Sequence, residues 1–188
     1  GKPKKEEGYY SVAGDCVAWL YGHILGLDEP DDYDPALKNF SYETLPIVPS
    51  TFKKHVKGGS YKNAFNVIQK LAKDADEIIH VGDPDREGQY LVDEVLEAIK
   101  NKKPTKRLLI NAYDDVSVKR AFDSMEDNSS SKLRNQYKAA LGRDYTDWLI
   151  GMNASRKYSL DSGKTLKVGR VKVPTLALVA RRNEEIEN

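Results

Sequence analysis

Short apolar runs that read as strands alternate with helical segments between residues 60 and 125, and this alternation most constrains the fold. Residues 77–82 form one such run, bounded by turn residues, and residues 107–111 form the next. Apolar residues recur at helical spacing over residues 62–75, from Leu91 to Ile99 and over residues 116–125. Strands that alternate with helices usually form a mostly parallel sheet with flanking helices. The sequence therefore predicts a layered α/β domain here.

The segment before this domain carries weaker signals. Residues 9–12 and 16–20 read as two short strands joined in a tight hairpin at Gly14-Asp15. Residues 28–59 are rich in proline and lack a sustained period, so we expect a long surface loop. Ser60 is in position to cap the helix that follows it.

The last part of the chain is expected to be helical. Residues 127–131 form a polar loop suited to a boundary, and residues 132–160 then have a helical pattern. Residues 172–187 predict another helix, with Pro174 in its first turn, where proline is tolerated.

Composition excludes several classes of protein. The 188 residues are 39% apolar and 31% charged, and no apolar run approaches the roughly 20 residues that cross a bilayer. No apolar segment follows the basic start, so we expect no secretory signal, no membrane association and a cytoplasmic protein.

Cys16 is the only cysteine, which excludes an internal disulfide and a multi-cysteine zinc site. We expect Cys16 to be a small buried apolar residue. The three histidines lack paired spacing, which disfavours a zinc hydrolase.

Three carboxylates follow the predicted strand at residues 77–82. Asp83, Asp85 and Glu87 lie at i, i+2 and i+4 on a turn that also contains Pro84 and Gly88. In α/β sheets, ligands collect beyond the carboxyl ends of strands, and Mg²⁺ prefers such oxygen ligands. This spacing predicts a Mg²⁺ site, while a solvated acidic turn remains the alternative.

Two other motif interpretations fail on context. The acidic residues, with Gly88 and Glu94, fall at positions of a calcium-binding EF-hand loop, but such a loop follows a helix and this one follows a strand. Residues 162–165 (Ser-Gly-Lys-Thr) end like a phosphate-binding loop, yet Tyr158 stands where that motif requires glycine. We therefore set both aside.

A basic stretch follows later in the chain. Residues 156–182 contain eight lysines and arginines against one acid, Asp161. Such a stretch is able to follow DNA phosphates, although a solvated helix face has the same composition.

Residues 81–89 (Val-Gly-Asp-Pro-Asp-Arg-Glu-Gly-Gln) resemble the Toprim domain of type IA DNA topoisomerases, in particular the topoisomerase III branch. Other segments resemble that family in the same order, and together they cover nearly the whole chain. These are Trp19–Leu25, Leu45–Pro49, Leu91–Leu96, Asp147–Asn153 and Val168–Val171.

The resemblance implies a Rossmann-like α/β Toprim domain over residues 1–115, without its first strand, and the start of a helical gate-base domain over 116–188. It implies an isomerase that cleaves and religates single-stranded or negatively supercoiled DNA through a 5′-phosphotyrosine intermediate. Asp83 and Asp85 would hold Mg²⁺, and Glu87 would assist. We expect a monomer, and the resemblance names no protein partner.

The resemblance also assigns DNA contacts. Residues 167–172 (Lys-Val-Gly-Arg-Val-Lys) and Arg156 would contact DNA, with Lys167, Val168, Gly169, Arg170, Val171 and Lys172 each at a position of that motif. The family usually has serine and glutamine where this chain has Lys167 and Lys172, which adds charge and removes amide hydrogen bonding. Trp148 is expected in the core, and His23 as a hydrogen-bonded structural residue.

The family pattern includes two features that this sequence does not contain. One is a strand with a catalytic glutamate followed by Lys-Pro-Ser, and the other is the tyrosine motif, which matches none of the eleven tyrosines. We therefore expect this polypeptide alone to be unable to cleave DNA. Two alternatives stay open: another Toprim enzyme, such as a primase or nuclease, and a non-catalytic DNA-binding module.

Overall fold

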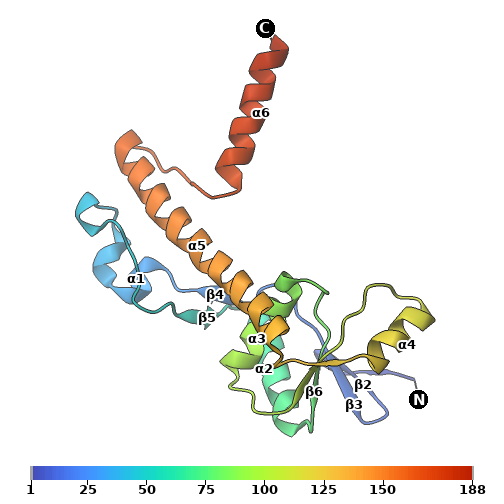
Figure 1. The fold of residues 1–188 in the computed structure, drawn as a ribbon. Helices are drawn as coiled ribbons and strands as arrows, with labels where there is room; N and C mark the ends of the chain where they lie inside the picture. Colours follow the sequence, from blue (N-terminus) through green and yellow to red (C-terminus); the bar gives the residue numbers. More distant parts are fainter. Residues whose placement is uncertain (1, 188) are drawn as a thin grey trace. The chain divides into compact units, whose positions relative to one another are not determined.

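The computed structural model describes residues 2–187 and divides them into two compact units. Unit 1 contains the chain up to Gly26 and Lys54–Leu141, and unit 2 contains Leu27–Lys53 and the chain from Gly142 onward. The chain passes between the units within strand β4 (Leu25–Leu27), just before β5 (Lys54–Val56), and within helix α5 (Ser131–Ser162). No helix in the described range is long and apolar enough to cross a membrane. Figure 1 shows the order of the elements.

Unit 1 begins with an antiparallel three-stranded sheet, β1 (Lys4–Lys5), β2 (Tyr9–Val12) and β3 (Asp15–Ala18). The predicted hairpin is confirmed, but its turn lies one residue earlier than predicted. Val12 pairs with Asp15, so Ala13 and Gly14 form the two-residue loop, with φ of 51° and 97°. Positive φ at both positions is what a type I′ hairpin turn requires.

The second sheet of unit 1 is mixed and has the order β6-β7-β8. Strand β6 (Ile78–His80) pairs in parallel with β7 (Thr105–Arg107), which pairs antiparallel with β8 (Glu126–Asp127). Helices α2 (Ser60–Asp74), α3 (Arg86–Ala98) and α4 (Asp115–Asp123) alternate with these strands, and α5 follows β8. The predicted α/β architecture, a sheet with flanking helices followed by a helical C-terminal segment, is confirmed. The division at residue 115 stays a prediction about family domains.

Two apolar clusters stabilise unit 1. Ile24, Leu25 and Val95 form the first, and half-buried side chains from β5 and α2 pack against it. Tyr90 of α3 packs with Tyr137 and Ala140 of α5 in the second. Helix α3 contributes to both clusters, so the side chains at its N-terminus are presented from a fixed support.

Unit 2 is organised by helix α5 and the segment predicted as a loop. That segment contains α1 (Pro30–Tyr33) and two 3-10 helices, η1 (Pro35–Lys38) and η2 (Tyr42–Thr44). Trp148 of α5 is buried, as predicted, and its indole N–H donates to the Asp28 carbonyl at 3.0 Å. The side-chain amide of Asn153 donates to the Ile47 carbonyl and accepts from the Ile47 N–H. The proline-rich segment is therefore fastened to a helix.

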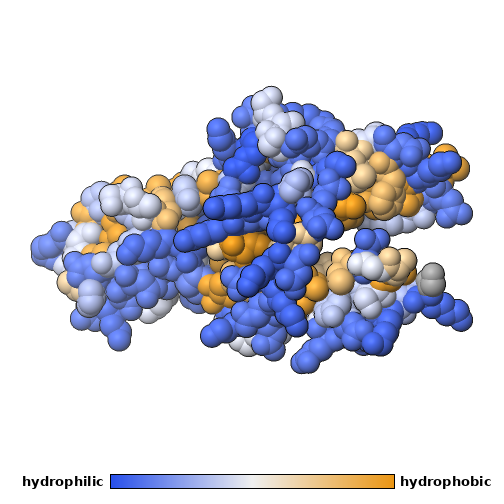
Figure 2. Space-filling view, turned by 90° about the horizontal axis from the view of Figure 1, so that it is seen from below, coloured by the Kyte–Doolittle hydropathy of each residue, from blue (hydrophilic) through white to orange (hydrophobic). Residues whose placement is uncertain are grey.

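Helix α6 (Lys172–Glu187) begins where the sequence predicts, and none of its described residues is buried. Its exposed side chains include Val173, Leu176 and Val179. Figure 2 shows that hydrophilic side chains cover most of the face drawn there, with apolar patches between them.

Several local predictions are wrong. Cys16 is exposed, because it lies on β3 of the small N-terminal sheet and not in a core. Ser60 is the first residue of α2, and the cap is Gly59, with φ of 65°. Strand β7 ends at Arg107, where the strand was predicted to begin. Residues 126–127, at the start of the predicted polar loop, form β8.

Candidate metal and nucleic-acid sites

The acidic turn, residues 83–88, connects β6 to α3. The side chain of Asp85 caps α3 by accepting a hydrogen bond from the Gly88 N–H at 2.7 Å. The Asp85 N–H donates to the Asp83 carbonyl at 2.8 Å, so the turn closes on itself. A carboxylate at a helix N-terminus also interacts favourably with the helix dipole.

Two glycines permit this close packing. A Cβ atom at Gly88 would lie 2.4 Å from both the N and the O of Asp83. A Cβ atom at Gly82 would lie 2.3 Å from the Gly88 carbonyl oxygen and 2.8 Å from the His80 ring. The backbone of the turn therefore lies directly against the first turn of α3, where no larger residue fits.

Arg107, the last residue of β7, holds the backbone of the acidic turn through side-chain hydrogen bonds. Its side chain is almost fully buried, and its Nη1 atom donates to the carbonyls of His80, Gly82 and Leu108 at 3.2, 2.6 and 2.9 Å. Nη2 donates to the Asp83 carbonyl at 2.5 Å, and Nε donates to Gln89 Oε1 at 2.8 Å. Burial lowers the pKa of Arg107, and nearby acids, first Asp93, raise it. Arginine stays protonated in such a setting, so a buried positive charge interacts with the carboxylates of Asp83 and Asp85.

A buried polar network continues behind Arg107. The Gln89 amide donates to Asp93 at 2.9 Å and to Asn128 at 2.7 Å, and Asn128 donates to the second oxygen of Asp93 at 2.7 Å. Burial raises the pKa of Asp93, and the hydrogen bonds from Gln89 and Asn128 lower it. The network connects α3 to the residue after β8.

His80, at the end of β6, is buried and neutral. Its Nδ1 atom accepts from the Gly82 N–H at 3.1 Å, and Nε2 lies 3.3 Å from the Gln89 carbonyl. Burial, followed by the charge of Arg107, lowers the pKa of His80 to about 4. One nitrogen must therefore accept and the other donate, which only the neutral ring can do.

Glu87 makes a different contact from its neighbours in the turn. Its Oε1 atom lies 3.0 Å from His23 Nε2, and the other ring nitrogen of His23 lies 3.0 Å from Glu94. The hydrogen bond with Glu94 raises the pKa of His23, partial burial lowers it, and Glu87 raises it further. Lys54 donates to the second oxygen of Glu94 at 2.9 Å. The expectation that His23 is hydrogen-bonded is confirmed, and its partners include the third acid of the turn.

The three acids of the turn do not converge in the described chain. Ligand atoms of Asp83, Asp85 and Glu87 do not all three lie within 4.8 Å of one another. Between residues 2 and 187, the Asp83 carboxylate has no hydrogen-bond or ion-pair partner, and exposed Arg86 likewise pairs with no acid. Asp85 uses one oxygen in its cap. Asp83 and Asp85 thus retain oxygen atoms of the kind that a hard divalent cation prefers.

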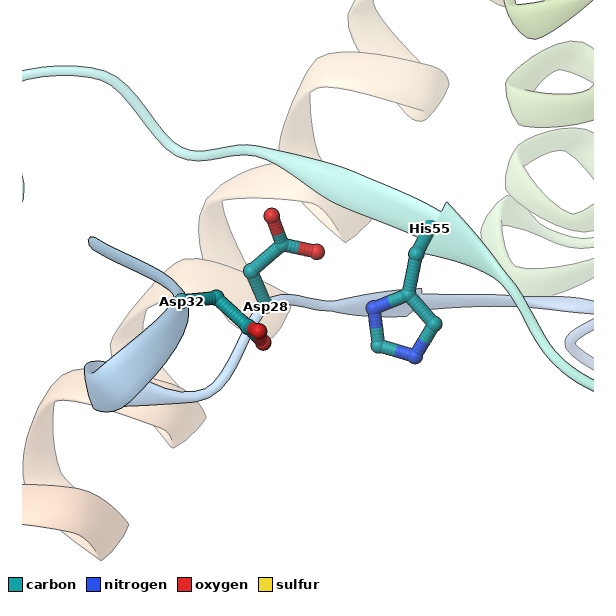
Figure 3. A group of neighbouring side chains, drawn as sticks. All are labelled: Asp28, Asp32 and His55. Carbon is teal, nitrogen blue, oxygen red and sulfur yellow. The ribbon is translucent and has the colours of Figure 1, made fainter. Parts of the chain in front are cut away.

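Figure 3 shows another set of potential metal ligands: Asp28, Asp32 and His55. Asp28 and Asp32 belong to unit 2, whereas His55 lies on β5 of unit 1. Neither unit contains all three residues, so we do not assign them a site.

In unit 2, two serines of α5 hold the segment that was predicted to contact DNA. Ser155 Oγ accepts from the Val168 N–H at 2.9 Å and lies 3.2 Å from its carbonyl. Ser159 Oγ makes the same pair of contacts with Leu166, at 2.9 and 3.2 Å. The two serines are four residues apart on α5, and the two residues that they bind are two residues apart on an extended segment that runs in the opposite direction. Lys167, between them, is exposed.

The predicted DNA-contact residues lie in different environments. Val168 and Gly169 are half-buried, while Arg170, Val171 and Lys172 are exposed. Arg170 pairs with Asp147 through Nε at 2.5 Å and Nη2 at 3.2 Å.

Arg156 is buried, donates to the Leu37 carbonyl at 2.6 Å and lies over the ring of Phe40. Its side chain has a structural role in unit 2, which argues against direct contact with DNA.

Sequence reasoning missed Arg107 and the serine pair. Arg107 was the first residue of a predicted strand, and one available signal was a charged residue entering an apolar run. For Ser155 and Ser159, the signal was their i, i+4 spacing beside a short segment without helical pattern.

Comparisons with known proteins agree with this architecture. The family model for the Toprim domain matches residues 2–113, and the model for DNA topoisomerase matches residues 131–188. A DNA topoisomerase 3 of Vibrio cholerae is 43% identical over 195 residues, covering 98% of this chain and 30% of the relative.

Two other relatives give the same picture. A DNA topoisomerase 3 of Salmonella typhimurium is 40% identical with the same coverage. One of Bacillus cereus is 35% identical over 187 residues, covering 98% of this chain and 25% of the relative. The chain spans less than a third of the length of these curated relatives.

Proposed function

Since the chain belongs to the topoisomerase III branch of the Toprim-containing type IA DNA topoisomerases, we propose that its acidic turn serves DNA strand cleavage and religation. The observation that carries the proposal is the fixed position of Asp83 and Asp85. Both follow β6, both lie at the N-terminus of α3, and Arg107 holds the backbone of the turn beneath them. Ligand sites in α/β proteins collect at such strand ends.

Asp83 and Asp85 are the residues that would hold Mg²⁺. Their oxygen atoms suit this ion, and Mg²⁺ usually needs only one or two protein carboxylates, since water and substrate phosphate supply its other ligands. When bound, the ion would neutralise charge on the DNA phosphate and orient the 3′ oxygen for religation. Arg107 would limit repulsion between the two carboxylates, because its charge is buried directly behind the turn.

Glu87 would act together with His23. Its contact with the imidazole fixes one carboxylate oxygen, and the residue lies in the first turn of α3. In the reaction that the family resemblance implies, a tyrosine oxygen bonds to phosphorus and the 3′ oxygen leaves as a hydroxyl. Religation reverses both bonds. A carboxylate held by a histidine is suited to move a proton to or from that 3′ oxygen.

Residues 167–172 would guide the single strand. Lys167 is exposed on a segment that Ser155 and Ser159 hold in place, and Arg170, also exposed, follows three residues later in the chain. Contacts from lysine and arginine to phosphates fix affinity and orientation without selecting sequence. We propose that the protein acts as a monomer on single-stranded or negatively supercoiled DNA of the cytoplasmic nucleoid, as suits relatives named as bacterial DNA topoisomerases.

The proposal is tested in a hybrid enzyme. The chain replaces the corresponding segment of the Vibrio cholerae relative, and relaxation of negatively supercoiled plasmid is measured with Mg²⁺. Asp83→Ala and Asp85→Ala should each lower the relaxation rate by about 100-fold or more, as expected when a group acting on the transition state is lost. The matched control, Asp123→Ala, removes an exposed acid at the end of α4 and should keep the activity. Equal rates in all three variants would contradict the proposal.

A further inference from the structure

Five lysines line a hollow of about 640 Å³ on unit 1, and none of the described residues lining it is acidic. We call this surface the lysine hollow. We infer that it binds the phosphate backbone of double-stranded DNA, as a contact separate from the acidic turn. Its lining residues are Asn66, Gln69, Lys70, Ala72 and Lys73 of α2, and Ile99, Lys100, Asn101, Lys102 and Lys103 after α3.

One side of the lysine hollow is a polar stripe of α2. Asn66, Gln69, Lys70 and Lys73 lie at i, i+3, i+4 and i+7, which places them on one face of the helix. All four are exposed, whereas Ala72 is buried in the protein. The stripe presents two amides and two ammonium groups in a row.

The other side is a loop held in one conformation by Asn101. The Asn101 side chain accepts from the Lys103 N–H at 3.0 Å and donates to the Lys103 carbonyl at 3.2 Å and to Thr105 at 3.1 Å. The Asn101 N–H donates to the Leu96 carbonyl at 2.9 Å, closing the end of α3. Three lysines are therefore carried on a preorganised loop, which lowers the entropy lost on binding.

Lys100 occupies a backbone conformation that favours glycine. Its φ is 55°, and it follows the last turn of α3, where helices commonly end with glycine in the left-handed region. A lysine at this position gives up stability that glycine would provide. Backbone strain of this kind is concentrated at functional positions, so this loss of stability is expected where the lysine charge has a function.

The charges of the lysine hollow are available to a ligand. In the chain between residues 2 and 187, none of its five ammonium groups pairs with a carboxylate. Glu97, near the same loop, is engaged by Arg134 at 2.8 Å and by the Tyr137 hydroxyl at 2.5 Å. A lysine near a helix C-terminus also complements the helix dipole. That effect acts within the last turn of the helix and does not explain why five lysines lie together here.

The lining favours duplex over single-stranded DNA. Proteins that bind single strands stack the bases on aromatic side chains, and no aromatic residue is among the described residues that line the hollow. Lysines and amides bind the phosphates of a duplex without reading its bases. The acidic turn lies at the N-terminus of α3 and the loop at its C-terminus, about 20 Å apart for 13 residues. Duplex in the hollow is therefore a separate contact from the strand at the acidic turn.

The test measures the affinity of the chain for a duplex oligonucleotide by fluorescence anisotropy, in EDTA and over a range of salt. Lys100→Gln, Lys102→Gln and Lys103→Gln are combined in one variant. Each phosphate contact contributes about eightfold at 0.1 M salt through counterion release, so affinity should fall about 100-fold or more. The slope of log K against log salt should decrease by about 2.7. The control combines Lys5→Gln, Lys119→Gln and Lys138→Gln, which are exposed elsewhere in unit 1, and should change affinity less than threefold.

Lys100→Gly separates lost binding from lost folding. Glycine relieves the positive φ, so the melting temperature should stay the same or rise while duplex affinity falls about eightfold. The inference is wrong if both triple variants lose affinity equally, if neither does, or if a single-stranded oligonucleotide loses as much as the duplex. It rests on the proposed function only in the choice of DNA. The duplex-binding assay contains no Mg²⁺, so a negative result there would not affect the result of plasmid relaxation by the hybrid enzyme. Failure of this inference and failure of the proposed function are therefore distinguishable.

Discussion

Replacing Arg107 with methionine should strongly destabilise unit 1. The guanidinium donates to four backbone carbonyls and to the Gln89 side chain. Leu108 and Gln89 are buried, so their oxygen atoms would lose a donor that water cannot replace. An unsatisfied buried acceptor costs about 1–3 kcal/mol, and two of them give about 4 kcal/mol. The carbonyls of the acidic turn lie nearer to solvent and add less.

The assay is urea denaturation at pH 7, followed by circular dichroism. Arg107→Lys keeps the charge but offers three donors in place of five, so it should lose about 2 kcal/mol, half the cost of methionine. The control is Lys106→Met, at the preceding position of β7, where an exposed ion pair with Glu77 at 3.0 Å contributes at most about 1 kcal/mol. A free energy of unfolding for Arg107→Met within 1 kcal/mol of the wild type would refute the account of how the turn is held.

Two further predictions concern the same region. Gly88→Ala should destabilise the protein by about 3 kcal/mol or more in urea denaturation, because its Cβ would lie 2.4 Å from Asp83 backbone atoms. Gly142 lies in the interior of α5 with open space where a Cβ would be, so Gly142→Ala should stabilise the protein by about 0.5–1 kcal/mol. Similar effects of the two changes would contradict the packing described for the turn. His80 is neutral when folded, so as pH falls from 6.5 towards 4 only the unfolded chain gains a proton there, and stability should fall by up to about 3 kcal/mol. His80→Asn should flatten this part of the stability curve measured by denaturation between pH 4.5 and 7.5. An unchanged curve would show that another group is responsible, and Asp93 is not that group because its raised pKa acts in the opposite sense.

The sequence predicted elements whose signals are local. The helices, the hairpin and the position of the acidic turn after a strand all follow from residue spacing and turn residues within a short window. Trp148 was expected in the core from its neighbours on α5, and it is buried. The metal-ligand and DNA-contact roles of individual residues stay predictions.

Contacts between distant segments were beyond the reach of sequence patterns. Glu87 and His23 are 64 positions apart, and no periodicity links them. The proline-rich segment looked like a loop because its backbone partners are side chains of α5 more than 100 positions away, such as Asn153. Cys16 was expected to be buried from its residue type, but a short edge strand such as β3 offers no core to enter.

The most direct test of the central claim is Mg²⁺ binding at the acidic turn. Isothermal titration of Mg²⁺ into the chain should give a binding signal that Asp83→Ala combined with Asp85→Ala removes, because these side chains supply the oxygen ligands. Asp123→Ala, which removes an exposed acid on α4, should leave the signal unchanged. Identical Mg²⁺ binding by the wild type and the double variant would contradict the assignment of this turn as the metal site.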